Sequence, residues 1–321
     1  MQQYVFFILT YYEVKESFGL SAQLVVRCIA KVADAYKLDR KVQRTFNPLG
    51  AVAFDDRILS YKQSSVSIWT VGGRQSIPFV CGPRQRELLE KRIGESDLAF
   101  VRGEWYLLTT AEIETPEPID IEGVLGIDLG VSNIAVDSDG EIHSANIIKN
   151  VRYRHRRLRQ KLQKLGTLGS RRRLRQLAGK EKRFASHVNH VISKQIVTKA
   201  KCTKRAVALE ELTHIRTRIK ARKPQRVTLH SWSFAQLRDF VTYKAQLRGV
   251  PVHFVDPRNT SRTCPSCGHC AKENRKTQSS FICTSCGFAG IADVIAAGNI
   301  ASRAAVNPPY YSNADGLAVS E

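Results

Sequence analysis

The sequence predicts an α/β protein, and three features lead to this prediction. In the second half of the chain, short apolar segments alternate with longer stretches of helical periodicity. A long basic stretch interrupts this alternation in the middle, and two Cys-x-x-Cys pairs interrupt it near the end. The first 118 residues mix both periodicities more loosely, which indicates a mixed α+β region ahead of the α/β core.

The N-terminal region contains one clear helical pattern followed by alternating segments. Ser21–Lys37 carries apolar residues at helical spacing. Ser65–Thr70 and Trp105–Thr110 alternate as strands do. The run Glu112–Glu122 combines several acids with two prolines, which indicates a linker. We therefore expect this region to end near residue 118.

The elements expected after residue 118 come in an order typical of one α/β architecture. Strands are expected at Val124–Gly130, Asn133–Gly140, Glu141–Ile148, Arg205–Leu212 and Val250–Asp256. Helices are expected at 151–200, Ser233–Arg248 and Ala292–Ala305. The order is three strands, a helical region, a strand, a helix, a strand and a final helix. This is the order of elements in an RNase H-like core, although periodicity alone does not distinguish that core from other α/β folds.

Three acids lie where such a core would place a metal site. Asp128 lies within an apolar strand, Glu210 ends another apolar strand, and Asp293 opens the last expected helix. Two carboxylates about 4 Å apart repel by about 4 kcal/mol at an effective dielectric near 20, so an ionised cluster requires cations. Oxygen ligands suit Mg²⁺ or Mn²⁺. Taken singly, the three acids are better explained as a turn residue, a solvated strand end and a helix cap than as metal ligands.

The cysteines predict a structural zinc site. Cys264-Pro-Ser-Cys267-Gly and Cys283-Thr-Ser-Cys286-Gly are two knuckles separated by 15 residues. Four thiolates close a tetrahedron around one zinc ion and leave no open position for catalysis. The alternative is a pair of redox disulfides. Cys270 is expected to be a bystander thiol.

The charge of the chain predicts a polyanionic partner. Fifty Lys and Arg against 29 Asp and Glu give a formal net charge of +21. Fifteen of the basic residues and only one acid, Glu181, lie between Lys149 and Arg183. A stretch of one sign repels itself unless it lies along phosphates, although it could also be a solvated helix. The candidate phosphate contacts are Arg152, Arg156, Arg157, Arg171, Arg172, Arg173 and Arg183.

A membrane or secreted protein is not expected. The apolar opening stretch Tyr4–Tyr11 is too short to cross a bilayer and lacks the pattern of a signal peptide. Five of the eight cysteines fall within 23 residues, which favours metal binding over a disulfide framework. The expected compartment is the reducing cytoplasm.

Several ordered motifs over residues 119–305 resemble the transposon-encoded TnpB (OrfB) nucleases, relatives of the type V CRISPR effectors. The motifs are Gly126-Ile127-Asp128-Leu129-Gly130, Leu209-Glu210-Glu211-Leu212, Ser231-Trp232-Ser233-Phe234, Tyr243-Lys244, Asp256-Pro257-Arg258-Asn259-Thr260-Ser261, both knuckles and Ala292-Asp293-Val294 with Ala296-Ala297 and Asn299-Ile300. Arg183-Phe184 and His190 with Ser193 also fit the family's central helix. Residues 20–118 fit its upstream wedge and recognition region more loosely.

The resemblance implies an RNA-guided DNA endonuclease with a RuvC-like site, used in association with a transposon and with nucleoid DNA. Asp128, Glu210 and Asp293 match the catalytic positions, which imply two Mg²⁺ or Mn²⁺ ions, and the four knuckle cysteines match the ligands of one zinc. The expected division is an N-terminal region over 1–118, the first part of the nuclease core over 119–257 with basic helices at 150–200, a zinc ribbon over 258–290, the last core helix over 291–305 and a tail over 306–321.

Two departures from the family pattern keep an alternative open. Ile295 stands where the family usually has Asn, and the opening Met1–Leu20 does not resemble the usual beginning, which suggests a truncated copy. The alternative is therefore a catalytically idle remnant that still binds nucleic acid. A strand-transfer transposase is disfavoured by the ribbon between the last strand and the last helix, and tyrosine-type transposition by the absence of a His-x-His motif. The guide RNA, the motif beside the target and the oligomeric state cannot be read from the sequence.

Overall fold

A computed structural model describes residues 2–211 and 234–306. The chain consists of two compact units, Met1–Glu114 and Thr115–Glu321. The division falls inside the predicted linker Glu112–Glu122. Three predicted segments lie partly outside the described residues. They are the Ser231–Ser233 part of one family motif, the last residue of the predicted strand Arg205–Leu212, and nearly all of the predicted tail. Within the described ranges, no helix has the length and apolar character needed to cross a membrane.

The first unit is a mixed α+β region, as its periodicities predict. Its elements are α1 (Gln2–Phe18), α2 (Ala22–Leu38), β1 (Val52–Phe54), β2 (Leu59–Tyr61), β3 (Ser65–Thr70), β4 (Gly73–Pro78), α3 (Pro83–Glu90), β5 (Arg92–Val101) and β6 (Glu104–Ala111). The strands form two antiparallel sheets, β1-β5-β6 and β2-β3-β4. Leu24 of α2 packs with Phe54, Leu59 and Ile68 in a small core.

The second unit is built on a five-stranded mixed sheet. Its strands are β7 (Gly123–Asp128), β8 (Asn133–Asp137), β9 (Ile142–Ser144), β10 (Arg205–Glu210) and β11 (Val252–Val255). They lie in the order β11-β10-β7-β8-β9. β7, β10 and β11 are parallel, whereas β8 and β9 continue from β7 as antiparallel neighbours. The elements thus follow one another in the predicted order.

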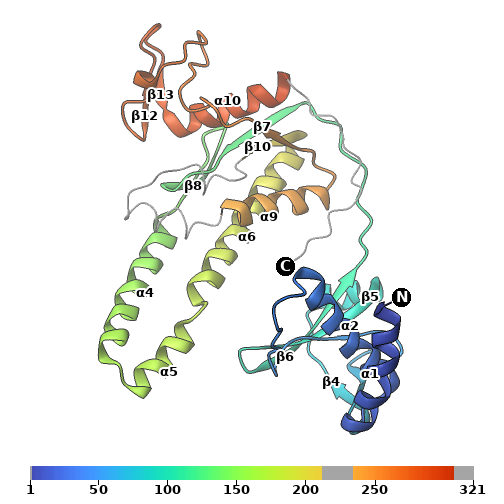
Figure 1. Cartoon of the computed structure of the whole chain (residues 1–321). Helices are drawn as coiled ribbons and strands as arrows, with labels where there is room; N and C mark the ends of the chain where they lie inside the picture. Colours follow the sequence, from blue (N-terminus) through green and yellow to red (C-terminus); the bar gives the residue numbers. More distant parts are fainter. Residues whose placement is uncertain (1, 212–233, 307–321) are drawn as a thin grey trace. The chain divides into compact units, whose positions relative to one another are not determined.

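Helices cover both faces of this sheet (Figure 1). α6 (Lys180–Cys202) and α9 (Phe234–Gln246) pack on the face that carries Leu125 and Ile127 of β7 and Val207 and Leu209 of β10. α10 (Ala292–Val306) packs on the opposite face, where Ala208, Val255, Ile300 and Ala304 meet. Successive side chains of a strand point to opposite faces of the sheet. Because helices cover both faces at β7 and β10, residues on both sides of these strands are buried, which explains their continuous apolar sequences.

The region between β8 and β10 differs from the prediction in two places. The expected strand Glu141–Ile148 is wrong beyond Ser144, because α4 (Asn146–Leu165) begins at Asn146 and buries Ile148 in its first turn. The expected helical region 151–200 is divided into α4, α5 (Leu168–Leu177) and α6. The breaks occur at Gly166 and Gly179, whose positive φ angles of 63° and 75° end a right-handed helix.

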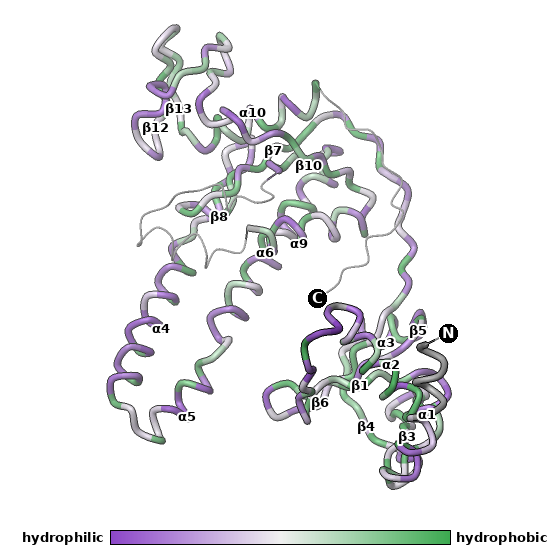
Figure 2. Tube along the Cα trace, in the orientation of Figure 1, coloured by the Kyte–Doolittle hydropathy of each residue, from purple (hydrophilic) through white to green (hydrophobic). Residues whose placement is uncertain are grey.

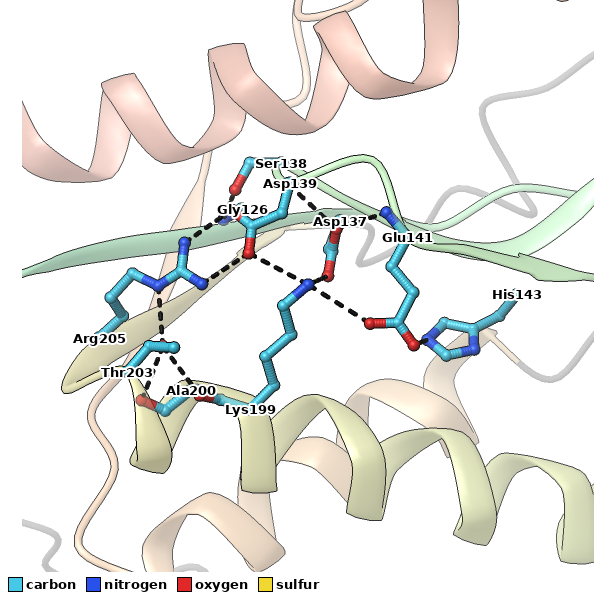
Figure 3. A network of polar contacts seen from close by, with 10 residues as sticks. All are labelled: Gly126, Asp137, Ser138, Asp139, Glu141, His143, Lys199, Ala200, Thr203 and Arg205. Atoms are coloured by element: carbon cyan, nitrogen blue, oxygen red, sulfur yellow. Dashed lines mark hydrogen bonds and ion pairs between the residues drawn. The ribbon is translucent and has the colours of Figure 1, made fainter.

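An ion network holds the β8–β9 hairpin to α6 and to the start of β10 (Figure 3). The buried carboxylate of Asp137 accepts hydrogen bonds from the backbone N–H groups of Asp139 and Glu141 and forms an ion pair with Lys199 of α6. Arg205 donates two hydrogen bonds, of 2.8 and 2.6 Å, to Asp139 and holds the pKa of that carboxyl well below its usual range. The network lies at the opposite end of β10 from Glu210.

Gly126 of β7 lies against the backbone of α10. A Cβ atom at this position would lie 2.0 Å from the carbonyl oxygen of Ala297 and 2.6 Å from the backbone nitrogen of Ala301. Any side chain would therefore push α10 away from the sheet. The absence of a side chain at Gly126 sets the position of the helix that carries Asp293.

We expect Gly126→Ala to lower the free energy of unfolding by about 3 kcal/mol or more, since backbone atoms rather than flexible side chains must move. Urea denaturation of the full chain measures the effect. Gly123→Ala on the same strand is the matched control, because its Cβ would meet only the Arg205 side chain, at 3.7 Å. Equal stability of the two variants would contradict the close packing of α10 on β7.

Candidate functional site

The carboxyl ends of two parallel strands bring the first two candidate acids together. Asp128 is the last residue of β7 and Glu210 the last residue of β10. Leu209 pairs with Ile127, so the two acids follow these partners at the same edge of the sheet. Asp293 lies in the first turn of α10, the helix packed on β7. Elements from three distant parts of the chain thus converge on one edge.

The electrostatics of Asp128 place Glu210 and Asp293 near it. Burial raises the pKa of Asp128 to about 7, and repulsion from Glu210 and Asp293 adds to the shift, while Arg275 opposes it. Burial also raises the pKa of Glu210, which a hydrogen bond from Thr260 counteracts. Asp128 and Glu210 therefore both resist ionisation where they lie, and a bound cation would offset this cost. Their oxygen atoms are the donors that hard divalent cations prefer.

Glu210 and Asp293 are each held in position by side chains that the sequence analysis did not assign to the site. Arg275 Nη2 donates to Asp293 Oδ1 at 2.7 Å, and Asn133 Nδ2 donates to Asp293 Oδ2 at 3.0 Å. Thr260 Oγ1 donates to Glu210 Oε1 at 2.5 Å. Thr260 lies inside a motif quoted for the family resemblance, which was a usable signal. Arg275 lies in a polar segment between the knuckles, where nothing in its neighbours indicates a role.

Ile295, two residues after Asp293, stands where the family usually has Asn. It is buried with Cys264, Phe281 and Cys283, so its side chain joins α10 to the cysteine-rich segment. Asn299, on the same helix, binds the backbone of a neighbouring loop. Its side-chain amide nitrogen Nδ2 donates to the carbonyl oxygens of Thr260 and Thr263, each at 2.8 Å. Asn299 thereby anchors the loop that carries Thr260.

The four knuckle cysteines converge on one point. Their sulfur atoms all lie within 4.8 Å of one another, with 3.6 Å between Cys264 and Cys286 and 3.6 Å between Cys267 and Cys283. Four sulfurs bound to a tetrahedral zinc at about 2.3 Å would stand about 3.8 Å apart. The donor set and its spacing therefore fit one structural zinc ion. Cys270 is exposed and lies outside this cluster.

Both knuckles have the backbone that sequence spacing indicates. Gly268 and Gly287 adopt positive φ angles of 73° and 75° and donate their N–H groups to the carbonyls of Cys264 and Cys283. The N–H of Cys286 points at the Cys283 sulfur at 3.5 Å, and this contact lowers the pKa of the Cys283 thiol to about 6. Thiolate, the form that binds zinc, is thus favoured at this position.

Residues 149–183, which we call the basic hairpin, carry the candidate phosphate contacts on α4, α5 and the start of α6. The hairpin appears in Figure 2 as mainly hydrophilic helices extending from the sheet. Six of the seven predicted arginines are exposed, namely Arg156, Arg157, Arg171, Arg172, Arg173 and Arg183. Arg152 differs, because it is half-buried and its Nε lies 3.3 Å from Glu181. Glu181 also binds Arg159 at 3.1 Å, so the one acid of the hairpin ties α4 to α6.

Fold and site together define a basic α/β protein with a cluster of carboxylates and a four-cysteine metal cluster. Two family models match the chain, "Probable transposase" (OrfB_IS605) over residues 109–213 and "Cas12f1-like, TNB domain" over residues 234–300. The TnpB-like protein MJ0751 of Methanocaldococcus jannaschii is 30% identical over 253 residues, which cover 70% of this chain and 85% of that relative. The chain belongs to the TnpB family.

Relatives outside TnpB include a CRISPR-associated protein. The endodeoxyribonuclease Cas12f2 of a Micrarchaeota archaeon is 32% identical over 194 residues, which cover 56% of this chain and 36% of that protein. Among solved structures, a Cas12f1-sgRNA-target DNA complex aligns with a TM-score of 0.47 and 19% identity over 91% of this chain and 82% of the other. This chain therefore spans only about a third of the Cas12f2 relative.

Proposed function

We propose that this protein is an RNA-guided DNA endonuclease that hydrolyses phosphodiester bonds at the carboxylates of Asp128, Glu210 and Asp293. The observation that carries the proposal is the placement of Asp128 and Glu210 at the carboxyl ends of the paired strands β7 and β10, where the charges of Glu210 and Asp293 both act on Asp128. Such an arrangement is costly in a protein without a use for it, and it is typical of a cation-binding catalytic site. The name of the Cas12f2 relative, an endodeoxyribonuclease, supports the same activity.

The topology of the second unit supports an RNase H-like core of the RuvC type. An antiparallel β7-β8-β9 meander is extended by the parallel strands β10 and β11, with helices on both faces. In parallel sheets, ligand sites lie outside the carboxyl ends of the strands, which is where Asp128 and Glu210 are found. The proposed domains are those expected from the sequence, with the core at 119–257 and 291–305 and the zinc ribbon at 258–290.

The proposed roles of the site residues follow from their contacts. Asp128, Glu210 and Asp293 would supply the carboxylate oxygens that hold the cations, with Glu210 held in position by Thr260 and Asp293 by Arg275 and Asn133. Two Mg²⁺ or Mn²⁺ ions would activate the attacking water and neutralise charge on the leaving oxygen. The single zinc ion would hold the ribbon that delivers Arg275 to Asp293. The partners would be guide RNA and target DNA, bound in the cytoplasm at the nucleoid.

The alternative of a catalytically idle remnant rests mainly on Ile295. Its side chain is packed into the ribbon core with Cys264, Phe281 and Cys283, which weakens this reason. The three acids and the side chains that hold them are all present. We therefore favour the active enzyme.

The test supplies the full chain with guide RNA from its own locus, a matched DNA duplex and Mg²⁺. Guided cutting of the matched duplex, and not of an unmatched one, is the expected result. A wild-type protein that binds the guided target without cutting it, and still does not cut after Ile295→Asn, would establish the idle remnant.

Binding of nucleic acid to the basic hairpin should depend strongly on salt. Each phosphate contact contributes about −0.7 to −0.9 to the slope of log K against log salt. The triple variant with Arg171, Arg172 and Arg173 changed to Ala should therefore reduce the slope by about 2 to 3. Fluorescence anisotropy with labelled duplex at several salt concentrations measures it. Arg152→Gln is the comparison, since Arg152 is paired with Glu181 and should contribute little. A slope unchanged by the triple variant would remove α5 from the interface.

A further inference from the structure

The tip of the basic hairpin presents two leucines to solvent. Leu165 is the last residue of α4 and Leu168 the first of α5, with only Gly166 and Thr167 between them. Their side chains are 58% and 73% exposed. Large apolar side chains that gather at one exposed place usually mark a contact with a partner. Both side chains are more than half exposed, so neither leucine contributes much to holding the hairpin together.

The turn that carries these leucines is well ordered by hydrogen bonds. The N–H of Ser170 donates to Thr167 Oγ1 at 3.1 Å, and Ser170 Oγ donates to the Thr167 carbonyl at 2.8 Å. Ser170 is only 5% exposed, and Gly166 takes the positive φ that the turn requires. The leucines are thus displayed by a capped turn rather than by a frayed helix end. A fixed apolar tip loses little conformational freedom when it binds.

The charges around the tip select the partner. Lys161 and Lys164 precede it and Arg171, Arg172 and Arg173 follow it, without an acid between Lys149 and Lys180. Glu181, the one acid of the hairpin, is engaged by Arg152 and Arg159 at the far end. A second copy of the hairpin would bring like charges together, whereas the sugar-phosphate backbone is complementary.

We propose that Leu165 and Leu168 form a wedge that stacks against the terminal base pair of a nucleic-acid duplex whose phosphates lie along α4 and α5. Apolar side chains inserted beside base pairs are a known means of capping or unstacking a duplex. The 20 residues of α4 span about 30 Å, nearly one helical turn of a duplex, so cations along the arm reach phosphates while the tip reaches the end. The inference rests on nucleic-acid binding by the proposed enzyme, but not on cleavage.

The test compares two forms of one short RNA–DNA hybrid, one with an open end and one with both ends closed by hairpin loops. A 2-aminopurine at the terminal pair of the open form reports unstacking. The zinc-loaded full chain should bind the open form more tightly and change its fluorescence. The variant Leu165→Ser/Leu168→Ser should lose about tenfold in affinity for the open form and the fluorescence change, while its affinity for the closed form and its salt slope stay as in the wild type.

Ile147→Ser is the matched control, because Ile147 is also on α4 and 65% exposed, but lies at the opposite end of the helix from the tip. It should behave as the wild type. The wedge would be overturned if the double variant lowered the affinity for the open and the closed form equally, or if it changed neither affinity. A wild-type dimer that the double variant dissociates would assign the tip to a second copy instead. Loss of all salt-dependent binding in the wild type would refute the proposed function itself, which separates the two failures.

Discussion

Replacing Asp128 with Asn is expected to reduce guided DNA cleavage by about 10³-fold or more, which corresponds to about 4 kcal/mol in the barrier. The variant keeps the shape of the side chain but removes the charge that Glu210 and Asp293 face. Cations would bind weakly, so the attacking water would lose its activation. Single-turnover cleavage of a labelled target with the guide RNA bound measures the loss. Glu210→Gln and Asp293→Asn should behave alike.

The double variant Asp128→Asn/Glu210→Gln should be little worse than either single variant, because residues that hold the same ions act as a unit. Binding of the guided target should survive, since the basic hairpin is unchanged. Asp139→Asn is the matched control, an acid at the other end of the sheet that pairs with Arg205. Cleavage lost equally in this control, or retained in Asp128→Asn, would refute the proposed site.

Replacing Cys283 with Ser should release the ribbon's metal and unfold the ribbon. The cluster of four sulfurs replaces a hydrophobic core in this segment, where only Cys264, Phe281, Cys283, Ala292 and Ile295 are buried together. Zinc contributes about 10 to 16 kcal/mol of apparent folding free energy to such small domains, so three remaining ligands are not expected to suffice. Elemental analysis should fall from about one zinc per chain to near zero, and limited proteolysis should cut within 258–290.

Cleavage should be lost together with zinc, because Arg275 of the ribbon is a partner of Asp293. The matched control is Cys270→Ser, which changes an exposed thiol of the same segment outside the cluster. It should keep the zinc and the protease resistance. A folded wild-type chain with much less than one zinc, or a Cys283→Ser variant that keeps it, would show that the ribbon does not depend on the metal.

The parts of the molecule that depend on local sequence were the most predictable. Apolar periodicity predicted β7 and β10 in the right order, since both are buried on two faces. Spacing alone predicted the knuckles, because two residues and a glycine define each turn. Gly166 and Gly179 divide the helical region because both adopt positive φ angles. The sequence contains many glycines and does not show which of them adopt such angles.

Contacts between distant segments were beyond the reach of the sequence. Arg275 reaches Asp293 only because the ribbon folds back over the carboxyl edge of the sheet. Ile295 stands at a motif position where the family usually has Asn, but a motif does not show which way a helix side chain faces, and here it packs in the ribbon core. The convergence of Asp128, Glu210 and Asp293 is different, because the family motifs predicted that these acids share one site, although periodicity alone does not specify the strand order that brings them together.

The placement of α10 on β7 also has a consequence for synthesis on the ribosome. The strand that ends in Asp128 is made early, but the helix that covers one of its faces and carries Asp293 comes 165 residues later (293 − 128 = 165). At about 5 to 20 residues per second, translation of this interval takes about 8 to 33 s. Throughout that time Asp293 has not yet been made, so the proposed site cannot form. One face of β7 lacks its native cover during this interval, so we expect the yield of folded protein to depend on translation speed.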